Sequence, residues 1–179
     1  KKELFVDFLY KTASNSSKGS LYNVIFSEIN SYKVSAYEFT GYLACINSIK
    51  SYYKANMDML QFENRKELFM VANRPIYTKI KDEHPTLYVE GCHVYNSLVA
   101  DGCIIKGTLK NGLVARYVVV ENDVELDNCI ILQNCHIKAG AKLSNVIIDK
   151  NAIIEKGTEL KGSAQYPLVV EKRNFFGNL

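Results

Sequence analysis

The chain contains 179 residues, of which 47% are hydrophobic, which is enough to bury a sizeable core and excludes a disordered protein. Its 22 Lys and Arg face 19 Asp and Glu without a long run of either sign, which argues against nucleic acid as a partner. No apolar stretch approaches the roughly 18 residues of a membrane span and no signal-type core follows the first residues, so we expect a cytoplasmic protein without membrane partners.

The first 60 residues carry two helical patterns with a strand pattern between them. Apolar side chains recur at helical spacing at Leu4, Phe5, Phe8 and Leu9. The same spacing returns, behind an Asn47-Ser48 pair typical of a helix N-cap, at Ile49, Tyr52, Tyr53, Met57 and Leu60. Between the two, residues 33–39 alternate loosely, as a strand would. This half therefore predicts α/β character.

The composition changes near residue 90. Of the 20 Tyr and Phe residues, only Tyr117 falls within 96–165, a stretch rich in Val, Ile, Gly and Asn. All three Pro residues, at 75, 85 and 167, lie outside this stretch. Because Pro lacks a backbone donor, this placement favours an element that uses all of its backbone N–H groups.

The second half carries a six-residue period. Asn or Gly stands at 122, 128, 134 and 140, and again at 145, 151 and 157 after one step of five, and Asn96 and Gly102 fit the same count. These residue types tolerate positive φ at a corner. Large aliphatic residues follow three positions after a corner, at Val99, Ile105, Ile131, Ile137, Leu143, Ile148, Ile154 and Leu160. Small residues follow one position after a corner, at Cys103, Cys129, Cys135, Ala141 and Ala152.

In a strand, positions one and three point to the same face, so both sets of side chains are expected to face inward. A hexapeptide period predicts a parallel β-helix with three hexads in each coil, in which every coil needs its neighbours to bury its faces. Corners at 107 and 112 break the count and leave Lys110, Ala115 and Glu125 where aliphatic residues are expected. We therefore interpret residues 106–121 as a coil with an insertion.

Few residues suggest chemistry. His136 stands two positions after a corner and is expected on the outer face, where an outward His serves as general base in hexapeptide-repeat acyltransferases. A solvated His is favoured, because no orienting partner is evident nearby. A zinc site made by His84, His93 and His136 is not supported by their spacing.

The five Cys residues are odd in number and lie among aliphatic residues, which favours reduced, buried thiols over disulfides. Those at 103, 129 and 135 occupy the small inward position as apolar filler, where metal binding is not expected. Five basic residues stand in the irregular part of the repeat or after the repeat: Lys106, Lys110, Arg116, Lys172 and Arg173. They could bind phosphate, although scattered solvated charge is the simpler interpretation. The sequence contains no GxGxxG, P-loop or nucleophile motif.

Five segments resemble one family in the same order along the chain: YEFTGY at 37–42, NSIKSYYKANMD at 47–58, PIYT at 75–78, NSLVADGC at 96–103 and NVIIDKN at 145–151. The family is that of the bacterial glucose-1-phosphate adenylyltransferases, or ADP-glucose pyrophosphorylases. Within it, the sequence is most similar to the regulatory-type subunit of glycogen synthesis in Gram-positive bacteria.

The resemblance implies a fold and a reaction. Members condense ATP with glucose 1-phosphate to ADP-glucose and pyrophosphate with Mg²⁺, using a Rossmann-like catalytic domain followed by a left-handed β-helix. On this basis residues 1–70 are a C-terminal remnant of the nucleotidyltransferase domain, 71–93 a linker, 94–165 the left-handed β-helix and 166–179 a tail. The family's Gly-rich nucleotide loop is absent and the chain begins with Lys rather than Met, so we expect a C-terminal fragment that does not catalyse alone.

Two departures from the family pattern point to lost catalysis. Catalytic members carry a Gly-Tyr-Trp-Arg-Asp-Val-Gly-Thr run whose Asp binds Mg²⁺, whereas this chain reads GYLACINS at 41–48 and places Cys45 at the Asp position. A neutral thiol is a poor ligand for a hard cation such as Mg²⁺. Losing the metal removes several kcal/mol of charge stabilisation at the transferring phosphoryl group. The family's Asp-Phe-Gly-Lys-Asp segment is SLYNV at 20–24. We expect no catalytic residue, metal or cofactor in this chain, with Mg²⁺ held by a catalytic partner.

The resemblance also implies partners. In the family the β-helix packs against the catalytic domain and against neighbouring subunits, and phosphorylated effectors bind in the crevices between them. We therefore expect a hetero-tetramer with a catalytic subunit, allow a homo-oligomer, and take Arg116, which matches a family Arg, as the candidate for binding a phosphorylated sugar or nucleotide. The alternatives are a hexapeptide-repeat acyltransferase that uses His136, a catalytically active adenylyltransferase subunit, and a purely structural oligomerisation module.

Overall fold

The computed structural model describes residues 2–14, 20–78 and 80–172. The chain divides into two compact units, Lys1–Thr40 and Gly41–Leu179. The helices are α1 (Lys2–Ser14) and α2 (Leu21–Ser27) in the first unit and α3 (Ile49–Asp58) and α4 (Phe62–Phe69) in the second. The sequence prediction of helices at the two apolar repeats is confirmed by α1 and α3.

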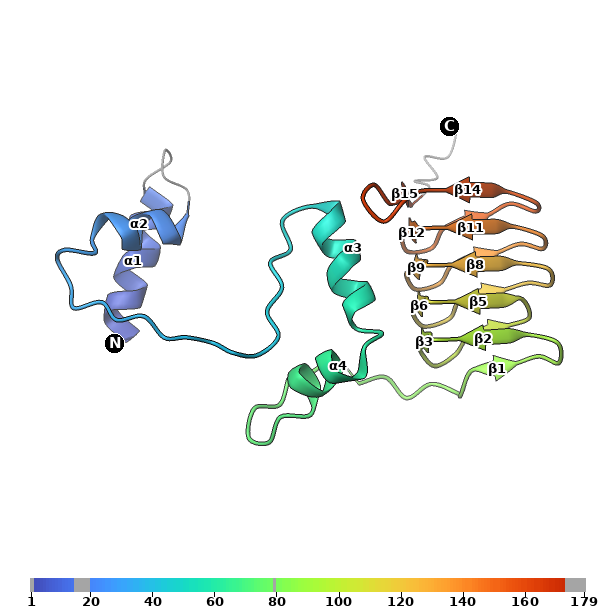
Figure 1. Ribbon diagram of the computed structural model, residues 1–179, viewed down its shortest axis with the longest axis horizontal. Coiled ribbons are helices and arrows are strands. Elements are labelled where there is room, and N and C mark those ends of the chain that lie inside the picture. Colours follow the sequence, from blue (N-terminus) through green and yellow to red (C-terminus); the bar gives the residue numbers. More distant parts are fainter. Residues whose placement is uncertain (1, 15–19, 79, 173–179) are drawn as a thin grey trace, which may run out of the picture. The chain divides into compact units, whose positions relative to one another are not determined.

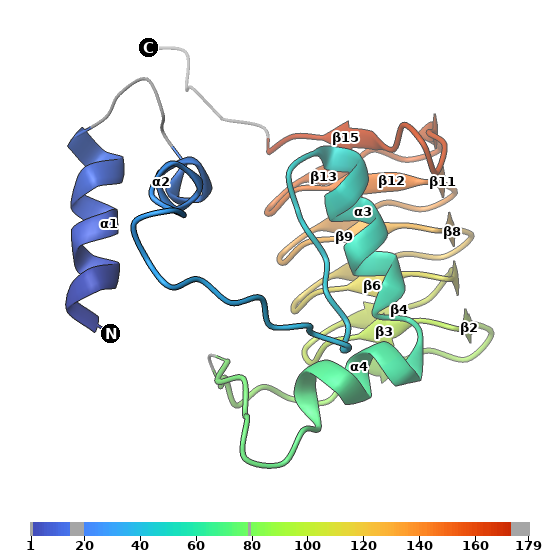
Figure 2. The same cartoon turned by 60° about the vertical axis from the view of Figure 1, so that its left-hand side comes forward.

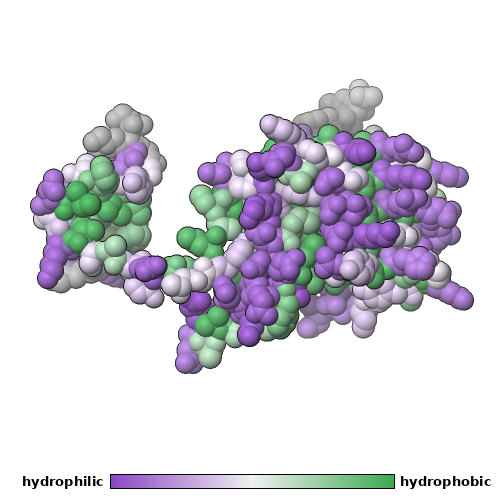
Figure 3. Space-filling view, in the orientation of Figure 1, coloured by the Kyte–Doolittle hydropathy of each residue, from purple (hydrophilic) through white to green (hydrophobic). Residues whose placement is uncertain are grey.

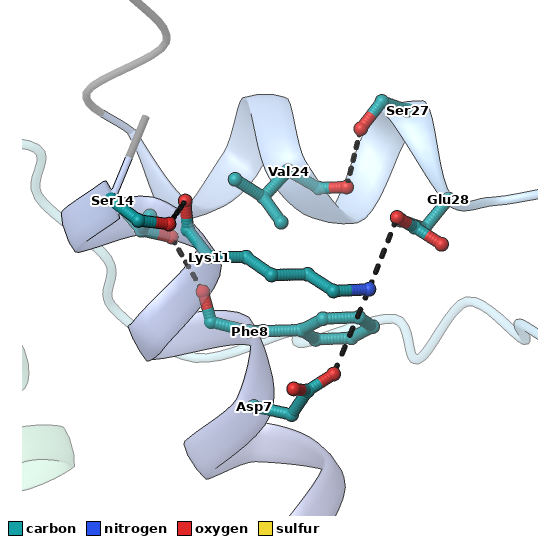
Figure 4. A network of polar contacts seen from close by, with 8 residues as sticks. Asp7, Phe8, Lys11, Ser14, Val24, Ser27 and Glu28 are labelled. Atoms are coloured by element: carbon teal, nitrogen blue, oxygen red, sulfur yellow. Dashed lines mark hydrogen bonds and ion pairs between the residues drawn. The ribbon is translucent and has the colours of Figure 1, made fainter. Parts of the chain in front are cut away.

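The first unit is a pair of helices with a small core. Phe8 of α1 and Val24 of α2 are buried, and the Phe8 ring meets the Tyr32 ring edge-on with centroids 5.5 Å apart. Figure 4 shows Lys11 extended over the Phe8 ring, with its Nζ 3.2 Å from Glu28 Oε1. Several other large apolar side chains of this unit are half or more exposed, among them Phe5, Tyr10, Tyr22 and Phe26.

The strand predicted for residues 33–39 is not formed. These residues are assigned neither helix nor strand, and the described part of the first unit contains no other strand to pair with them. A strand needs partners for its backbone N–H and C=O groups, so a loose alternation of apolar residues without a neighbour stays irregular and solvated. The α/β prediction for this half is thus confirmed only for its helices.

The second unit contains three parallel sheets of five strands each. Sheet A consists of β1 (Leu87–Tyr88), β4 (Ile104–Ile105), β7 (Val119–Val120), β10 (His136–Ile137) and β13 (Ile153–Ile154). Sheet B consists of β2 (His93–Tyr95), β5 (Thr108–Lys110), β8 (Glu125–Asp127), β11 (Lys142–Ser144) and β14 (Glu159–Lys161). Sheet C consists of β3 (Leu98–Val99), β6 (Leu113–Val114), β9 (Ile130–Ile131), β12 (Val146–Ile148) and β15 (Leu168–Val170).

The chain visits the sheets in the order A, B, C and then climbs one level, so the sheets form the three walls of a solenoid (Figure 1). The predicted parallel β-solenoid of hexapeptide repeats is confirmed. Its first strand lies within the predicted linker and its last within the predicted tail. Residues 173–179 of that tail, including Arg173, lie outside the described residues.

The lumen is filled as the period predicts. One continuous core contains the aliphatic residues Ile105, Ile131, Ile137, Leu143, Ile148 and Ile154 and the small residues Cys103, Cys129, Cys135, Ala141 and Ala152. Burial raises the pKa of the Cys129 thiol to about 11, so it stays protonated and serves as filler. All five Cys are free, but Cys45 is exposed, contrary to the expected burial.

The corners differ from the count at two places. The left-handed backbone falls on Asp123 (φ 59°) and Asn111 (φ 49°), one residue away from the predicted positions 122 and 112. In consequence Leu126 and Val114 face inward, in place of Glu125 and Ala115. Tyr117 (φ 61°) occupies a corner that a search for Asn and Gly could not find.

The coil that contains residues 106–121 is shorter than its neighbours, so the predicted insertion is wrong. Ile104 pairs with Val119, 15 positions later, whereas Val119 pairs with His136, 17 positions later. The two missing residues belong to the corner between sheets A and B, where Gly107 stands. A Cβ on Gly107 would lie 2.5 Å from the Val124 backbone O, so only glycine fits this shortened corner.

Helix α3 covers the outer face of sheet C (Figures 1 and 2). The outward side chains of this wall form an aliphatic column of Leu98, Leu113, Ile130, Ile147 and Val169. Tyr53 of α3 is buried against Ile130 and Ile147. The helix begins with the predicted cap, since the Ser48 side chain accepts from the Ser51 backbone N–H and the Ser51 side chain accepts in return from the Ser48 N–H.

Candidate functional site

The most developed polar feature is a column of four asparagines at the corner between sheets B and C: Asn96, Asn111, Asn128 and Asn145. All four have positive φ, between 43° and 54°. The Asn96 Nδ2 donates to Asn111 Oδ1 over 2.8 Å. Asparagine recurs here because it tolerates the left-handed corner and its amide can bond to the coil above or below.

Helix α3 and this asparagine column enclose a groove of about 560 Å³. The Tyr53 hydroxyl donates to the Asn128 backbone O over 2.8 Å and lies 3.2 Å from Asn145 Oδ1. Lys50 and Lys54 line the same groove, and Lys54 Nζ is 3.1 Å from Asp58 Oδ2. The groove can therefore offer amide and ammonium donors to a polar or anionic ligand. The corners at Asn96, Asn128 and Asn145 were predicted from the sequence, the corner at Asn111 was expected one residue later, and the alignment of all four in one column was not predicted.

We predict a modest stability role for the Tyr53 hydroxyl that depends on pH. Burial raises the pKa of Tyr53 to about 12 from its ordinary value of 10. The Tyr53→Phe variant should lose about 0.5–1.5 kcal/mol of unfolding free energy near neutral pH, because a buried hydrogen bond to Asn128 is removed.

Above pH 10 the unfolded tyrosine ionises before the folded one, so the wild-type advantage is complete below pH 10 and declines as pH rises toward 12. Urea unfolding of wild type and variant over this range measures the difference. A difference that grows with pH would contradict the prediction.

Arg116, the candidate effector residue, lies at the corner between sheets C and A and is not among the residues that line the asparagine groove. Its backbone O accepts from the Asn134 N–H over 3.1 Å. Its side chain is half-buried, and the Nε atom is buried with no hydrogen-bond partner among the described residues. A buried guanidinium N–H without an acceptor is costly, and an anionic oxygen would satisfy it.

Cys45 lies in the extended segment before α3 and is exposed. The neighbouring Tyr42 donates its hydroxyl to Asp58 Oδ2 over 3.1 Å, and its backbone N–H donates to Glu67. Within the described ranges, no three His, Cys, Asp or Glu side chains gather as a metal-binding group.

His136 lies on the outer face of sheet A, as predicted, but it does have an orienting partner. Its Nε2 is 2.6 Å from Glu121 Oε1, and the other oxygen of Glu121 accepts from the Ala139 N–H over 2.9 Å. The Ala139 N–H and His136 together hold the pKa of Glu121 below its ordinary value. The expectation of an unpartnered His136 is therefore wrong. His93 lies on sheet B and His84 precedes β1, so the three histidines belong to different parts of the solenoid.

Comparison with known proteins agrees with this architecture. Residues 85–165 match the family described as "GlmU-like, C-terminal hexapeptide". The chain is 38% identical over 178 residues to the glycogen biosynthesis protein GlgD of Bacillus subtilis, covering 98% of this chain and 51% of that protein.

The chain is also 30% identical over 135 residues to the glucose-1-phosphate adenylyltransferase of Thermodesulfovibrio yellowstonii, covering 74% of this chain and 32% of that enzyme. The enzyme of the same name from Bacillus mycoides is 30% identical over 129 residues, 72% of this chain and 34% of the enzyme. The chain thus spans about half the length of GlgD and about a third of the adenylyltransferases.

The three-walled coil and the family match define a hexapeptide-repeat β-solenoid protein. The chain belongs to the glucose-1-phosphate adenylyltransferase family, in which it is GlgD-like, as the sequence segments predicted. Among the described residues, no helix is long and apolar enough to cross a membrane.

Proposed function

We propose that this chain is the C-terminal part of a non-catalytic regulatory subunit that supports ADP-glucose synthesis from ATP and glucose 1-phosphate in glycogen biosynthesis. The observation that carries the proposal is the match to GlgD, which covers 98% of the chain at 38% identity, whereas the matches to the two adenylyltransferases named above cover 72–74% at 30%. The cytoplasm is the compartment that we expect for this function.

The absence of catalysis is supported by Cys45. A thiol at the position of the family's metal-binding Asp cannot offer the charged oxygen that Mg²⁺ prefers, and Cys45 is exposed rather than set among carboxylates. In the proposal, Mg²⁺ and turnover belong to a catalytic subunit with which this protein forms a hetero-oligomer, and this chain holds no cofactor. A catalytically active subunit would need another carboxylate in place of Cys45.

The proposal also assigns residues 1–70 to the end of a Rossmann-like domain and a left-handed turn to the solenoid, both implied by the family resemblance. Helices in such domains cover the faces of a sheet. The aromatic side chains of Phe5, Tyr22 and Phe26 support this assignment, because they are exposed on α1 and α2 and the described part of the first unit contains no strand for them to pack against.

Regulation is proposed to act through Arg116. Its buried Nε has no acceptor among the described residues, so a phosphorylated sugar or nucleotide could supply one and stabilise one state of the assembly over another.

The test is ADP-glucose synthesis by the catalytic subunit with and without the full-length form of this protein. We expect co-elution and a change in the effector response, and a shift of roughly 5-fold or more in the half-saturating effector concentration when Arg116→Gln replaces wild type. Lys142→Gln on sheet B, far from this corner in the coil, is the control and should leave the response unchanged. No co-elution and no change in rate or response would refute the proposal.

A second candidate is supported by the His136–Glu121 pair, because a carboxylate that holds a histidine is the arrangement of a general base. An acyltransferase that used it would bind acyl-CoA and assemble with three-fold symmetry. Calorimetry with acetyl-CoA and the oligomer mass separate the two functions. A purely structural module would bind its partner without any response to sugar phosphates.

A further inference from the structure

The three walls of the solenoid present different outer faces. The outer face of sheet B carries the charged and polar residues Thr108, Glu125, Lys142 and Glu159, and this side of the molecule is mainly hydrophilic in Figure 3. The aliphatic face of sheet C is covered by α3. The outer face of sheet A combines a mainly aliphatic column with a charged column, and every outward side chain of these two columns is partly or largely exposed within the described ranges.

The open face of sheet A consists of two columns of side chains. The register places the first outward column at Leu87, Ile104, Val119, His136 and Ile153. Leu87 is 57% exposed and Ile153 is 43% exposed, and the side chains between them are partly exposed. Aliphatic residues in successive coils on an uncovered wall are typical of an interaction surface.

The second outward column is a ladder of alternating charge, Lys106, Glu121, Lys138 and Glu155, one residue per coil. Two neighbours in the ladder form an ion pair within the chain, since Lys138 Nζ is 2.7 Å from Glu155 Oε2. The spacing of the ladder is that of parallel strands, roughly 4.8 Å.

We infer that sheet A is an isologous interface between two copies of this chain, stacked face to face with their solenoids antiparallel. A two-fold axis parallel to the strands, between β7 and β10, reverses the order of the coils. It brings Lys106 opposite Glu155 of the other copy and Glu121 opposite its Lys138, so that every charge meets its opposite.

The same axis brings aliphatic residues together. Ile104 meets Ile153 of the second copy, and Val119 meets its His136, whose polar Nε2 already bonds to Glu121. Parallel stacking would instead place each charge against its own copy or against the aliphatic column. The apolar column therefore supplies contact area, and the charge ladder selects the antiparallel register.

The test is sedimentation velocity of this chain over a concentration series. Wild type should reach a species of twice 20.3 kDa. Lys138→Glu and Glu121→Lys should each weaken the dimer at least about tenfold, because each places two like-charge pairs across the axis. An equimolar mixture of the two variants should recover the wild-type affinity, since each new charge then faces an opposite one.

The matched control is Lys142→Glu, which makes the same change of charge on sheet B and should leave the dimer unchanged. If Glu121→Lys impairs folding through the lost Ala139 bond, Lys106→Glu with Glu155→Lys offers a second complementary pair at exposed positions.

A monomer at all concentrations, a trimer, or a dimer insensitive to Lys138→Glu would overturn the inference. The association needs no catalytic subunit, so its failure leaves the proposed regulatory function untouched.

Discussion

Replacing Leu126 with Ala is expected to lower the free energy of unfolding of the solenoid by about 2–5 kcal/mol. Leu126 lies in the middle of β8, is 1% exposed and belongs to the continuous lumen core. Its removal leaves a cavity that the stacked coils cannot collapse to fill, because β5 and β11 hold β8 on both sides. Urea unfolding followed by far-UV circular dichroism measures the loss.

Glu125→Ala is the matched control for Leu126→Ala. Glu125 is the preceding residue on the same strand, faces outward and pairs with Lys142 at the surface. An exposed pair of this kind contributes about 0–1 kcal/mol. If Glu125→Ala proved as costly as Leu126→Ala, the register of β8 described here would be wrong, and the simple count of hexads that places Glu125 in the lumen would be correct.

The second large effect concerns the shortened corner. Gly107→Ala should cost about 1–3 kcal/mol, as overpacking does. The added Cβ would lie 2.5 Å from the Val124 O and 3.0 Å from the Glu121 O, and both are backbone atoms of the next coil that cannot rotate away. Thermal and urea unfolding check this prediction.

The control for the corner is Gly140→Asn. Gly140 has φ 73° and ample room, with nothing closer than 4.0 Å to an added Cβ, and Asn already occupies comparable corners at Asn134 and Asn145. Its substitution should change stability by no more than about 0.5 kcal/mol. Equal stability of Gly107→Ala and wild type would show that the corner between sheets A and B is wider than described.

Much of the solenoid could be predicted from its period, because each hexad repeats the same local requirement for a corner residue and an inward aliphatic side chain. The predicted corner positions were wrong or missing where a residue other than Asn or Gly occupies the corner. Asp123 and Tyr117 both adopt positive φ, and the corner at Asp123 is indicated in the sequence only by the need to bury Leu126 rather than Glu125. The insertion was predicted because Gly107 and Gly112 were taken as left-handed corners, whereas neither of them has positive φ.

The candidate site, like the solenoid, could be predicted from the sequence only in part. The sequence was enough to select Arg116, His136 and Cys45 as candidates. The structure places Arg116 at a corner, His136 on the outer face of a sheet and Cys45 in an exposed segment. The Glu121 partner of His136 was missed because the two are 15 residues apart and meet only through the stacking of successive coils. The asparagine groove likewise needs α3, which no period in the second half could locate.

The sequence by itself determined the three-walled coil and the cap of α3, since both depend on contacts between residues close in the chain or one repeat apart. It could not determine which wall α3 would cover, because outward aliphatic residues stand in successive coils on both sheet A and sheet C. Only the tertiary structure decided that α3 lies on sheet C rather than on sheet A, and the physical reason is the fit of Tyr53 between Ile130, Ile147 and the Asn128 carbonyl.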